Sequence, residues 1–188
     1  MAPVPVLRRR PRVARRARAE LSSHRAGLVA GVAGVVLLIA MLLPWFGPNA
    51  AQEQAIQDAQ EITQQFEGEP LPEPDLTENA WQAFTFVDLV LAATGLIGVL
   101  TGVVAVAGKP GRSAVGPIAA TAGLGILSSL LVLHRVINPI GEAAREYGLF
   151  VGFFAALAVA VGGWLALEAR TASGRTARPD SLGSRRDG

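Results

Sequence analysis

The chain has 188 residues and a mean hydropathy of +0.38, and 51% of its residues are hydrophobic whereas only 17% are charged. Four long runs are apolar and the charged residues lie in separate blocks, which excludes both a soluble globular domain and an intrinsically disordered chain. The absence of cysteine excludes disulfides and thiolate sites, and His24 and His134 lie far apart in sequence. We therefore expect no metal site and no cofactor.

The chain begins with a basic segment that leads into a first apolar run. Residues 1–25 are rich in arginine and contain one acid, Glu20. We expect this segment to lie in the cytoplasm and to contact anionic lipids rather than nucleic acid. Residues 26–46 carry no charge and can cross the roughly 30 Å hydrocarbon core as a helix. The run is too long for a signal-peptide core, so we expect the helix to be retained.

Residues 47–87 are expected to form a large outer loop. Up to position 82 the only charged residues are acidic: Glu53, Asp58, Glu61, Glu67, Glu69, Glu73, Asp75 and Glu78. Apolar residues recur there at spacings of four and three, which predicts an amphipathic helix over about residues 50–66: Ala55, Ala59, Ile62 and Phe66. Asn49 is its expected N-cap. We expect the apolar stripe to lie on the end of the bundle or on the bilayer, with contact to a partner protein as the alternative.

A second helix is expected to begin after the prolines of the loop. Thr77 can cap it, and Trp81, Phe84 and Asp88 then fall on one helical face that continues into the second span. This pattern predicts that the loop and the second span are joined by helix.

Three further apolar runs predict three more spanning helices, at residues 88–108, 114–134 and 147–167. A short basic turn at residues 109–113 joins the second and third spans, and an outer turn at residues 135–146 joins the third and fourth. The tail at residues 168–188 is rich in Ser, Gly and Arg, and we expect it to be disordered. The predicted fold is an all-α polytopic membrane protein with four transmembrane helices.

The basic residues predict the orientation of this bundle. Arginine and lysine concentrate in residues 1–25, 109–113 and 168–188, and these three segments fall on one side when four helices are threaded. The positive-inside rule places them in the cytoplasm, so that both termini are inside and the acidic loop is outside. We therefore expect a multi-pass protein of the cell membrane.

Aromatic residues near the span ends are expected to lie at the membrane–water interfaces. At the outer interface we expect Trp45, Phe46, Trp81, Phe84 and Tyr147, and at the inner interface Trp164. An aromatic belt is the simpler interpretation, and a ligand-binding aromatic cluster is the alternative.

Charged residues at the outer ends of two spans form a possible polar cluster. Asp88 opens the second span, and His134 and Arg135 close the third. Because these two helices run in opposite directions, the three residues share one depth, and an Asp88–Arg135 ion pair is geometrically possible. The alternative is that each side chain reaches water independently.

The middle of each predicted span lacks Asp, Glu, Lys, Arg and His. The interior polar residues are Thr94, Thr101, Thr121, Ser128 and Ser129. Coupled transport normally uses an intramembrane ionisable group, and membrane hydrolysis needs a base or a metal. We therefore expect neither an enzyme nor a coupled transporter, and we assign no catalytic residue.

Small residues recur four apart in the spans, a spacing that lets helix backbones approach closely in lipid. The pairs are Gly27/Gly31, Ala30/Gly34, Gly98/Gly102, Ala119/Gly123 and Gly148/Gly152. Packing within the chain is the first interpretation, and oligomer contacts are the alternative.

Several segments resemble a known family. They are LLPWF, NAWQAFTFVDLVL, HRVINP and REYGLFVGFFAALAVAVGGWLAL. The chain resembles small four-span membrane proteins of high-GC actinobacteria over about residues 26–170. This family has no assigned activity, so the resemblance implies a topology and brings no site residues.

Together these features predict a structural or regulatory membrane component that acts without catalysis. We expect it to engage another membrane or envelope protein through residues 47–82 or through its basic tails. The alternative is a small channel or passive transport subunit lined by the interior Thr and Ser residues. An integral membrane enzyme would have Asp88, His134 and Arg135 as its cluster.

Overall fold

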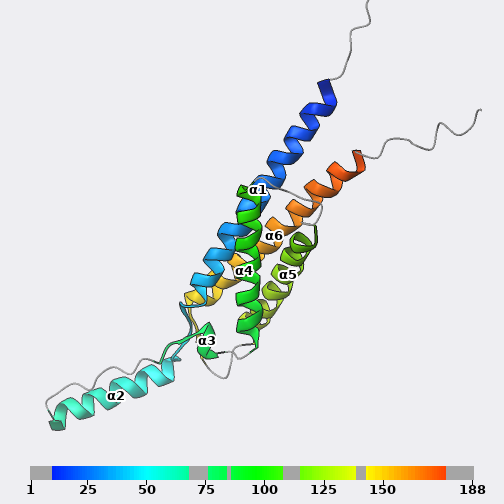
Figure 1. Ribbon diagram of the computed structural model, residues 1–188. Coiled ribbons are helices and arrows are strands. Elements are labelled where there is room, and N and C mark those ends of the chain that lie inside the picture. Colours follow the sequence, from blue (N-terminus) through cyan, green and yellow to red (C-terminus); the bar gives the residue numbers. More distant parts are fainter. Residues whose placement is uncertain (1–9, 68–75, 84–85, 108–114, 139–142, 177–188) are drawn as a thin grey trace, which may run out of the picture.

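The computed structural model describes residues 10–67, 76–83, 86–107, 115–138 and 143–176. Four long helices form a bundle (Figure 1): α1 (Arg10–Ala40), α4 (Val87–Val106), α5 (Val115–Ile137) and α6 (Tyr147–Thr176). Each contains a stretch long and apolar enough to cross a membrane: Leu21–Ala40, Val87–Val106, Gly116–Ile137 and Tyr147–Ala172. The prediction of four spanning helices is confirmed at this level.

The first spanning helix differs from the prediction at both ends. Helix α1 begins at Arg10, so it includes much of the basic segment, and it ends at Ala40 rather than at residue 46. Leu42 and Leu43 close the helix with backbone hydrogen bonds to Ile39 and Ala40, of 3.0 and 3.1 Å. Pro44 follows, and proline disfavours the helical conformation in the residue before it and has no N–H to donate. The predicted C-terminal end of this helix, at residue 46, is therefore wrong.

The last helix also extends beyond its predicted span. Helix α6 continues to Thr176, whereas the tail was expected to be disordered from residue 168. The added stretch begins Glu-Ala-Arg, and these residues favour helix. Residues 177–188 of the predicted tail lie outside the described part of the chain, as do residues 1–9 and the whole 109–113 turn.

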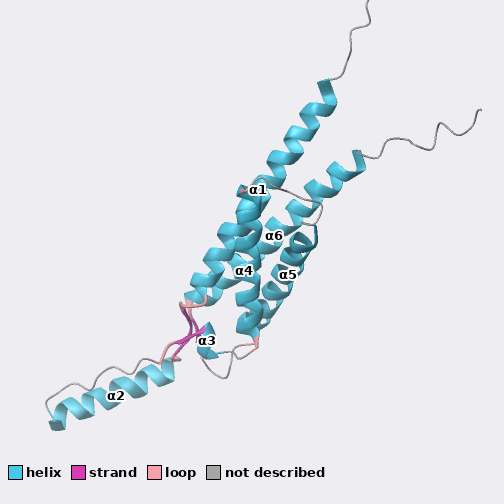
Figure 2. Cartoon of the chain, in the orientation of Figure 1, coloured by secondary structure: helices cyan, strands magenta, loops and turns pink. Residues whose placement is uncertain are grey.

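A small sheet joins the loops at one end of the bundle (Figure 2). Strand β1 (Pro44–Gly47) lies between β2 (Glu78–Asn79) and β3 (Ala144–Arg145), and both pairings are antiparallel. The expectation of an all-α fold is thus incomplete, because three short strands tie the chain after α1, before α4 and before α6. The pairing satisfies backbone groups that could not remain unpaired close to lipid.

Helices α1 and α6 form the centre of the bundle. They contact each other extensively, α4 packs on α1 and α5 packs on α6, whereas α4 and α5 contact each other over far fewer residues. The start of α1 and the end of α6 lie at the same end of the bundle (Figure 1). Helix α2 (Ala50–Glu67) extends away from the opposite end.

Glycines bring α1 and α4 into backbone contact. A Cβ atom added at Gly31 would lie 2.8 Å from Cα of Gly102, and one added at Gly34 would lie 2.5 Å from the carbonyl oxygen of Gly95. Glycines of the other pairs also pack within the chain, but a Cβ at Gly123 would meet nothing within 4 Å. Intrachain packing therefore accounts for the predicted small-residue pairs except Ala119/Gly123, where both residues are exposed.

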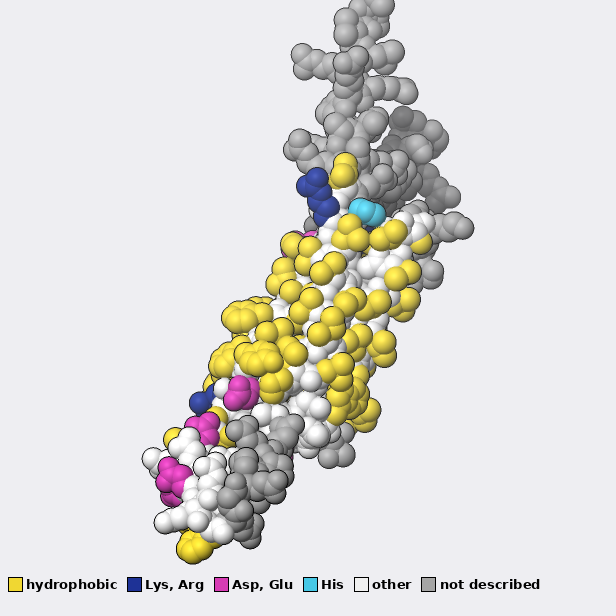
Figure 3. All heavy atoms as spheres, turned by 90° about the vertical axis from the view of Figure 1, so that its left-hand side faces the viewer, with side chains coloured by type: hydrophobic (Ala, Val, Ile, Leu, Met, Phe, Trp, Pro, Cys, Tyr) yellow, Lys and Arg dark blue, Asp and Glu magenta, His cyan; other side chains and the backbone are white. Residues whose placement is uncertain are grey.

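Hydrophobic side chains cover the middle of the bundle on the face drawn in Figure 3. Charged side chains lie at the two ends of this apolar band: Arg and His at one end, and mainly Asp and Glu toward α2 at the other. Many of the outward residues are large and apolar, among them Val32, Leu96, Leu130 and Phe154. A surface of this kind is suited to lipid and not to water.

Candidate functional site

Four of the five interior hydroxyl groups form two pairs between α4 and α5. Oγ1 of Thr94 is 2.7 Å from Oγ of Ser128, and Oγ1 of Thr101 is 2.7 Å from Oγ1 of Thr121. Thr94 also donates to the carbonyl of Val90 at 2.7 Å. A hydroxyl has a single hydrogen, so Ser128 is the donor to Thr94. Thr101 and Thr121 also donate to the carbonyls of Ile97 and Pro117 at 2.8 and 2.9 Å, so one of them shares its hydrogen between that carbonyl and the other hydroxyl. The two hydroxyl pairs connect the same two helices.

These hydroxyls are buried and satisfied. Thr94, Thr121 and Ser128 are completely buried, and Ser129 donates to the carbonyl of Gly125 at 2.7 Å. Each hydroxyl hydrogen therefore has an acceptor inside the protein, either across the interface or in the preceding turn of its own helix. Because α4 and α5 otherwise contact each other little, these hydrogen bonds favour the packing of α4 against α5.

Asp88 lies in the first turn of α4 and is buried, with only 2% of its surface exposed. Its Oδ1 atom has no hydrogen-bond partner within the described part of the chain. The position at a helix N-terminus favours a negative charge. Its neighbours Val87, Leu91 and Ala92 belong to the hydrophobic core at this end of the bundle. Asp88 is therefore placed in apolar surroundings rather than in contact with water.

His134 and Arg135 lie in the last turn of α5, at the same end of the bundle as the start of α4 (Figure 1). His134 is exposed and Arg135 is half-buried. Basic side chains at a helix C-terminus are favoured by the helix dipole. The three predicted cluster residues thus share one end of the molecule, and their joint action stays a prediction.

Two of the predicted interface aromatics are buried in the protein. Trp45 and Phe46 are 0% and 2% exposed, so their rings pack inside the protein, and their depth at the outer interface stays a prediction. Trp81, Tyr147 and Trp164 are exposed, by 48%, 57% and 54%, as residues of an aromatic belt would be. Phe84 lies outside the described residues.

Trp45 is buried because α6 provides a glycine-lined notch for its indole ring. A Cβ at Gly152 would lie 2.6 Å from Cζ2 of the ring, and one at Gly148 would lie 2.9 Å from Cδ1. The indole Nε1–H donates to the carbonyl of Ala40 at 2.6 Å. That carbonyl belongs to the last residue of α1 and also accepts from the backbone N–H of Leu43 at 3.1 Å, whereas Pro44, four residues on, has no N–H to donate. Trp45 therefore caps α1 and anchors β1 on α6.

Helix α2 is capped at its start and has an exposed apolar face. Asn49 Oδ1 accepts from the backbone N–H of Gln52 at 2.9 Å, and Gln52 Oε1 accepts from the backbone N–H of Asn49 at 3.0 Å. This reciprocal arrangement satisfies two backbone donors. Ile62 and Phe66 are 58% and 81% exposed. Among the described residues, α2 makes no extensive contact with the spanning helices, so its stripe does not lie on the end of the bundle.

The same capping pattern recurs before the second span. Asn79 and Gln82 exchange backbone-to-side-chain hydrogen bonds of 3.0 and 3.1 Å at the start of α3 (Ala80–Ala83). The expectation that Thr77 caps this helix is wrong. Helix α3 ends at Ala83 and α4 begins at Val87. The repeated Asn-x-x-Gln spacing, at 49–52 and 79–82, is the sequence signal that identifies both caps.

At the opposite end of the bundle, His24 connects α1 to the end of α4. Its Nδ1 atom lies 2.8 Å from the carbonyl oxygen of Ala105, so this nitrogen is the donor. The carbonyl is one of those that a helix end leaves without an intrahelical partner. Gly27, one turn further along α1, lies against the side chain of Ala105. His24 thus connects α1 to the last turn of α4 at this end of the bundle.

Within the described part of the chain, no three His, Cys, Asp or Glu residues are grouped so that they could hold a metal ion. The chain is not matched by any protein-family model, curated protein or solved structure.

Proposed function

We propose that this protein is a non-catalytic structural or regulatory component of the cell membrane that binds a partner protein through α2. The observation that carries the proposal is the exposed apolar face of α2, at Ile62 and Phe66, on a helix that is capped and stands clear of the bundle. Exposing large apolar side chains to water is unfavourable, and such faces are typical of interaction sites.

The charge of α2 favours a basic protein as its partner. Glu53, Asp58 and Glu61 are exposed on this helix, and it carries no Lys or Arg. Helices that lie on bilayers are usually rich in Lys and Arg, and an acidic helix is repelled by anionic headgroups. Pairing with α2 of a second copy would bring like charges together. A partner with an apolar groove flanked by Lys or Arg would bind the apolar face of α2 and attract its acidic side chains.

The distribution of basic residues supports an orientation with both termini in the cytoplasm and α2 outside. Because the natural chain has no cysteine, single cysteines can test it. We expect a membrane-impermeant maleimide to label Gln57→Cys, an exposed position of α2, in intact cells. It should label Ser181→Cys, in the basic C-terminal tail, only after lysis. Labelling of Ser181→Cys alone in intact cells would refute the orientation.

Site-specific crosslinking in native membranes tests the docking role. A benzophenone amino acid at Phe66 should capture a protein, whereas the same probe at Gln57, on the other side of α2, should capture much less. High salt and the triple variant Glu53→Lys/Asp58→Lys/Glu61→Lys should both reduce the Phe66 adduct, since screening and charge reversal weaken attraction to a basic partner. Adducts with lipid alone, or equal yields at the two positions, would contradict the proposal.

The alternative of a small channel predicts a pathway lined by the interior hydroxyls. Their mutual hydrogen bonds and burial support packing instead. A flux assay with the purified protein in liposomes separates the two, because a structural component should give no leak above that of empty vesicles.

A further inference from the structure

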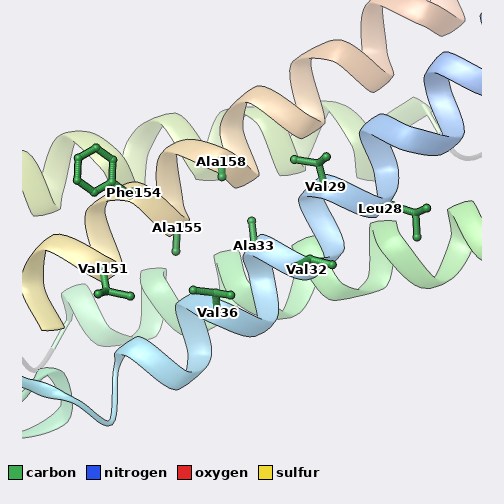
Figure 4. A pocket seen from close by; sticks show the side chains of 9 residues that line it. All are labelled: Leu28, Val29, Val32, Ala33, Val36, Val151, Phe154, Ala155 and Ala158. Atoms are coloured by element: carbon green, nitrogen blue, oxygen red, sulfur yellow. The ribbon is translucent and has the colours of Figure 1, made fainter.

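An apolar groove runs along the outer side of the contact between α1 and α6 (Figure 4). Its volume is about 650 Å³, within the roughly 300–1,000 Å³ range of small-molecule sites. All of its lining side chains are apolar: Leu28, Val29, Val32, Ala33, Val36, Val151, Phe154, Ala155 and Ala158. The groove exists because alanines occupy its floor, at Ala33 and Ala155, while larger side chains form its walls.

One arginine lies in line with this groove. Arg25 is exposed and precedes Val29, Val32 and Val36 by four, seven and eleven residues on the continuous helix α1. These spacings place all four residues on one face of the helix. The neighbouring His24 bonds to Ala105 of α4, so among the side chains that the structure describes Arg25 is the basic one on the groove face of α1.

The groove and Arg25 together match one leaflet of a bilayer. The lining on α1, from Leu28 to Val36, rises about 12 Å at 1.5 Å per residue, and the distance from Arg25 to Val36 is about 16 Å, close to half of a hydrocarbon core of roughly 30 Å. A ligand that fills it therefore needs an apolar chain of leaflet length and an anionic group at one end. A phospholipid with a negatively charged headgroup has both.

We infer that the α1–α6 groove holds an acyl chain of an anionic phospholipid whose headgroup phosphate binds Arg25. A second copy of this chain suits the groove less well, because a two-fold pair would oppose two concave surfaces and two Arg25 side chains. The inference is independent of the proposed docking role of α2.

Native mass spectrometry of the full-length protein tests this site, with lipid uptake from mixed vesicles of phosphatidylglycerol and phosphatidylcholine as the measurement. The unaltered protein should retain phosphatidylglycerol preferentially through mild delipidation. Arg25→Gln should reduce this preference about fivefold, as expected for one arginine at an anionic headgroup. Because Arg25 is exposed, this variant should fold normally, and Arg25→Lys should restore much of the preference.

A groove-filling variant tests the acyl chain separately. Ala158→Phe should lower retention of both lipids, whereas Gly123→Phe, on an open face of α5, should retain lipid as the unaltered protein does. The inference is overturned if Arg25→Gln keeps the full preference, or if Ala158→Phe, shown to be folded by its unfolding curve, retains as much lipid as Gly123→Phe. Should Ala158→Phe fail to fold, Arg25→Gln alone decides the outcome.

Discussion

Replacing Gly31 by alanine should force α1 and α4 apart and destabilise the bundle. The added Cβ would lie 2.8 Å from Cα of Gly102, whereas carbon atoms normally pack at about 3.5–4.0 Å. The obstructing atom belongs to the α4 backbone, so no side-chain rotation can relieve the contact. The two helices must therefore separate by about 1 Å, which is enough to forfeit a quarter to a half of the dispersion energy of the atom pairs along the interface.

We expect Gly31→Ala to lower the free energy of unfolding by about 1–2 kcal/mol, since overpacking typically costs about 1–3 kcal/mol and alanine regains about 0.5–1 kcal/mol of helix propensity. The matched control is Gly123→Ala, where the new Cβ meets nothing within 4 Å. That variant should be neutral or more stable by up to about 1 kcal/mol.

The assay is reversible unfolding in detergent micelles, followed by circular dichroism as the denaturing detergent fraction rises. The double variant Gly31→Ala/Gly102→Ala should cost less than the sum of its parts, because one separation of the helices relieves both contacts. Equal stability of Gly31→Ala and Gly123→Ala would refute the close α1–α4 contact.

Three further predictions use the same unfolding assay or hydrogen exchange. Trp45→Ala should lower the free energy of unfolding by about 3–5 kcal/mol, because the ring is completely buried and its Nε1–H caps α1. The control Trp164→Ala, at a residue that is 54% exposed, should change stability little. Similar losses for both variants would contradict the glycine-lined notch. A double-mutant cycle of Thr94→Val and Ser128→Ala should give a coupling of about 0.6 kcal/mol, the average for hydrogen bonds between membrane helices, and zero coupling would mean that the 2.7 Å bridge is absent. Asn49→Ala should destabilise α2 by about 1 kcal/mol and speed amide hydrogen exchange in this helix. The unfolding of the bundle should stay unchanged, because α2 stands clear of it. A loss of bundle stability would show that α2 packs on the spanning helices.

The four spans could be predicted from sequence because lipid imposes a local requirement. Every backbone polar group must be satisfied within the segment that crosses, so a spanning helix needs a long run of apolar residues, and such runs are visible without any knowledge of neighbours. The amphipathic pattern of residues 50–66 is local in the same way, and the structure has α2 at Ala50–Glu67.

The errors arose where distant segments meet. The position of Trp45 after an apolar run does not predict its burial, because Gly148 and Gly152 open a notch for it on α6, more than a hundred residues away. Pro44 marked a possible helix end, yet β1 forms only because β2 and β3 supply partners for its backbone. The periodicity of a sequence does not reveal pairings between segments that lie far apart in the chain.

The features of the candidate sites also separate into those that the sequence predicts and those that depend on tertiary contacts. Composition and spacing by themselves determined that the chain has four helices long and apolar enough to cross a membrane, an acidic amphipathic segment and no ionisable residue in the middle of an apolar run. Only the tertiary structure decided that the interior hydroxyls bond to one another, that α2 stands free and that alanines leave a groove beneath Arg25. Solvent preference is a property of each residue, whereas pairing and shape depend on which residues the fold brings together.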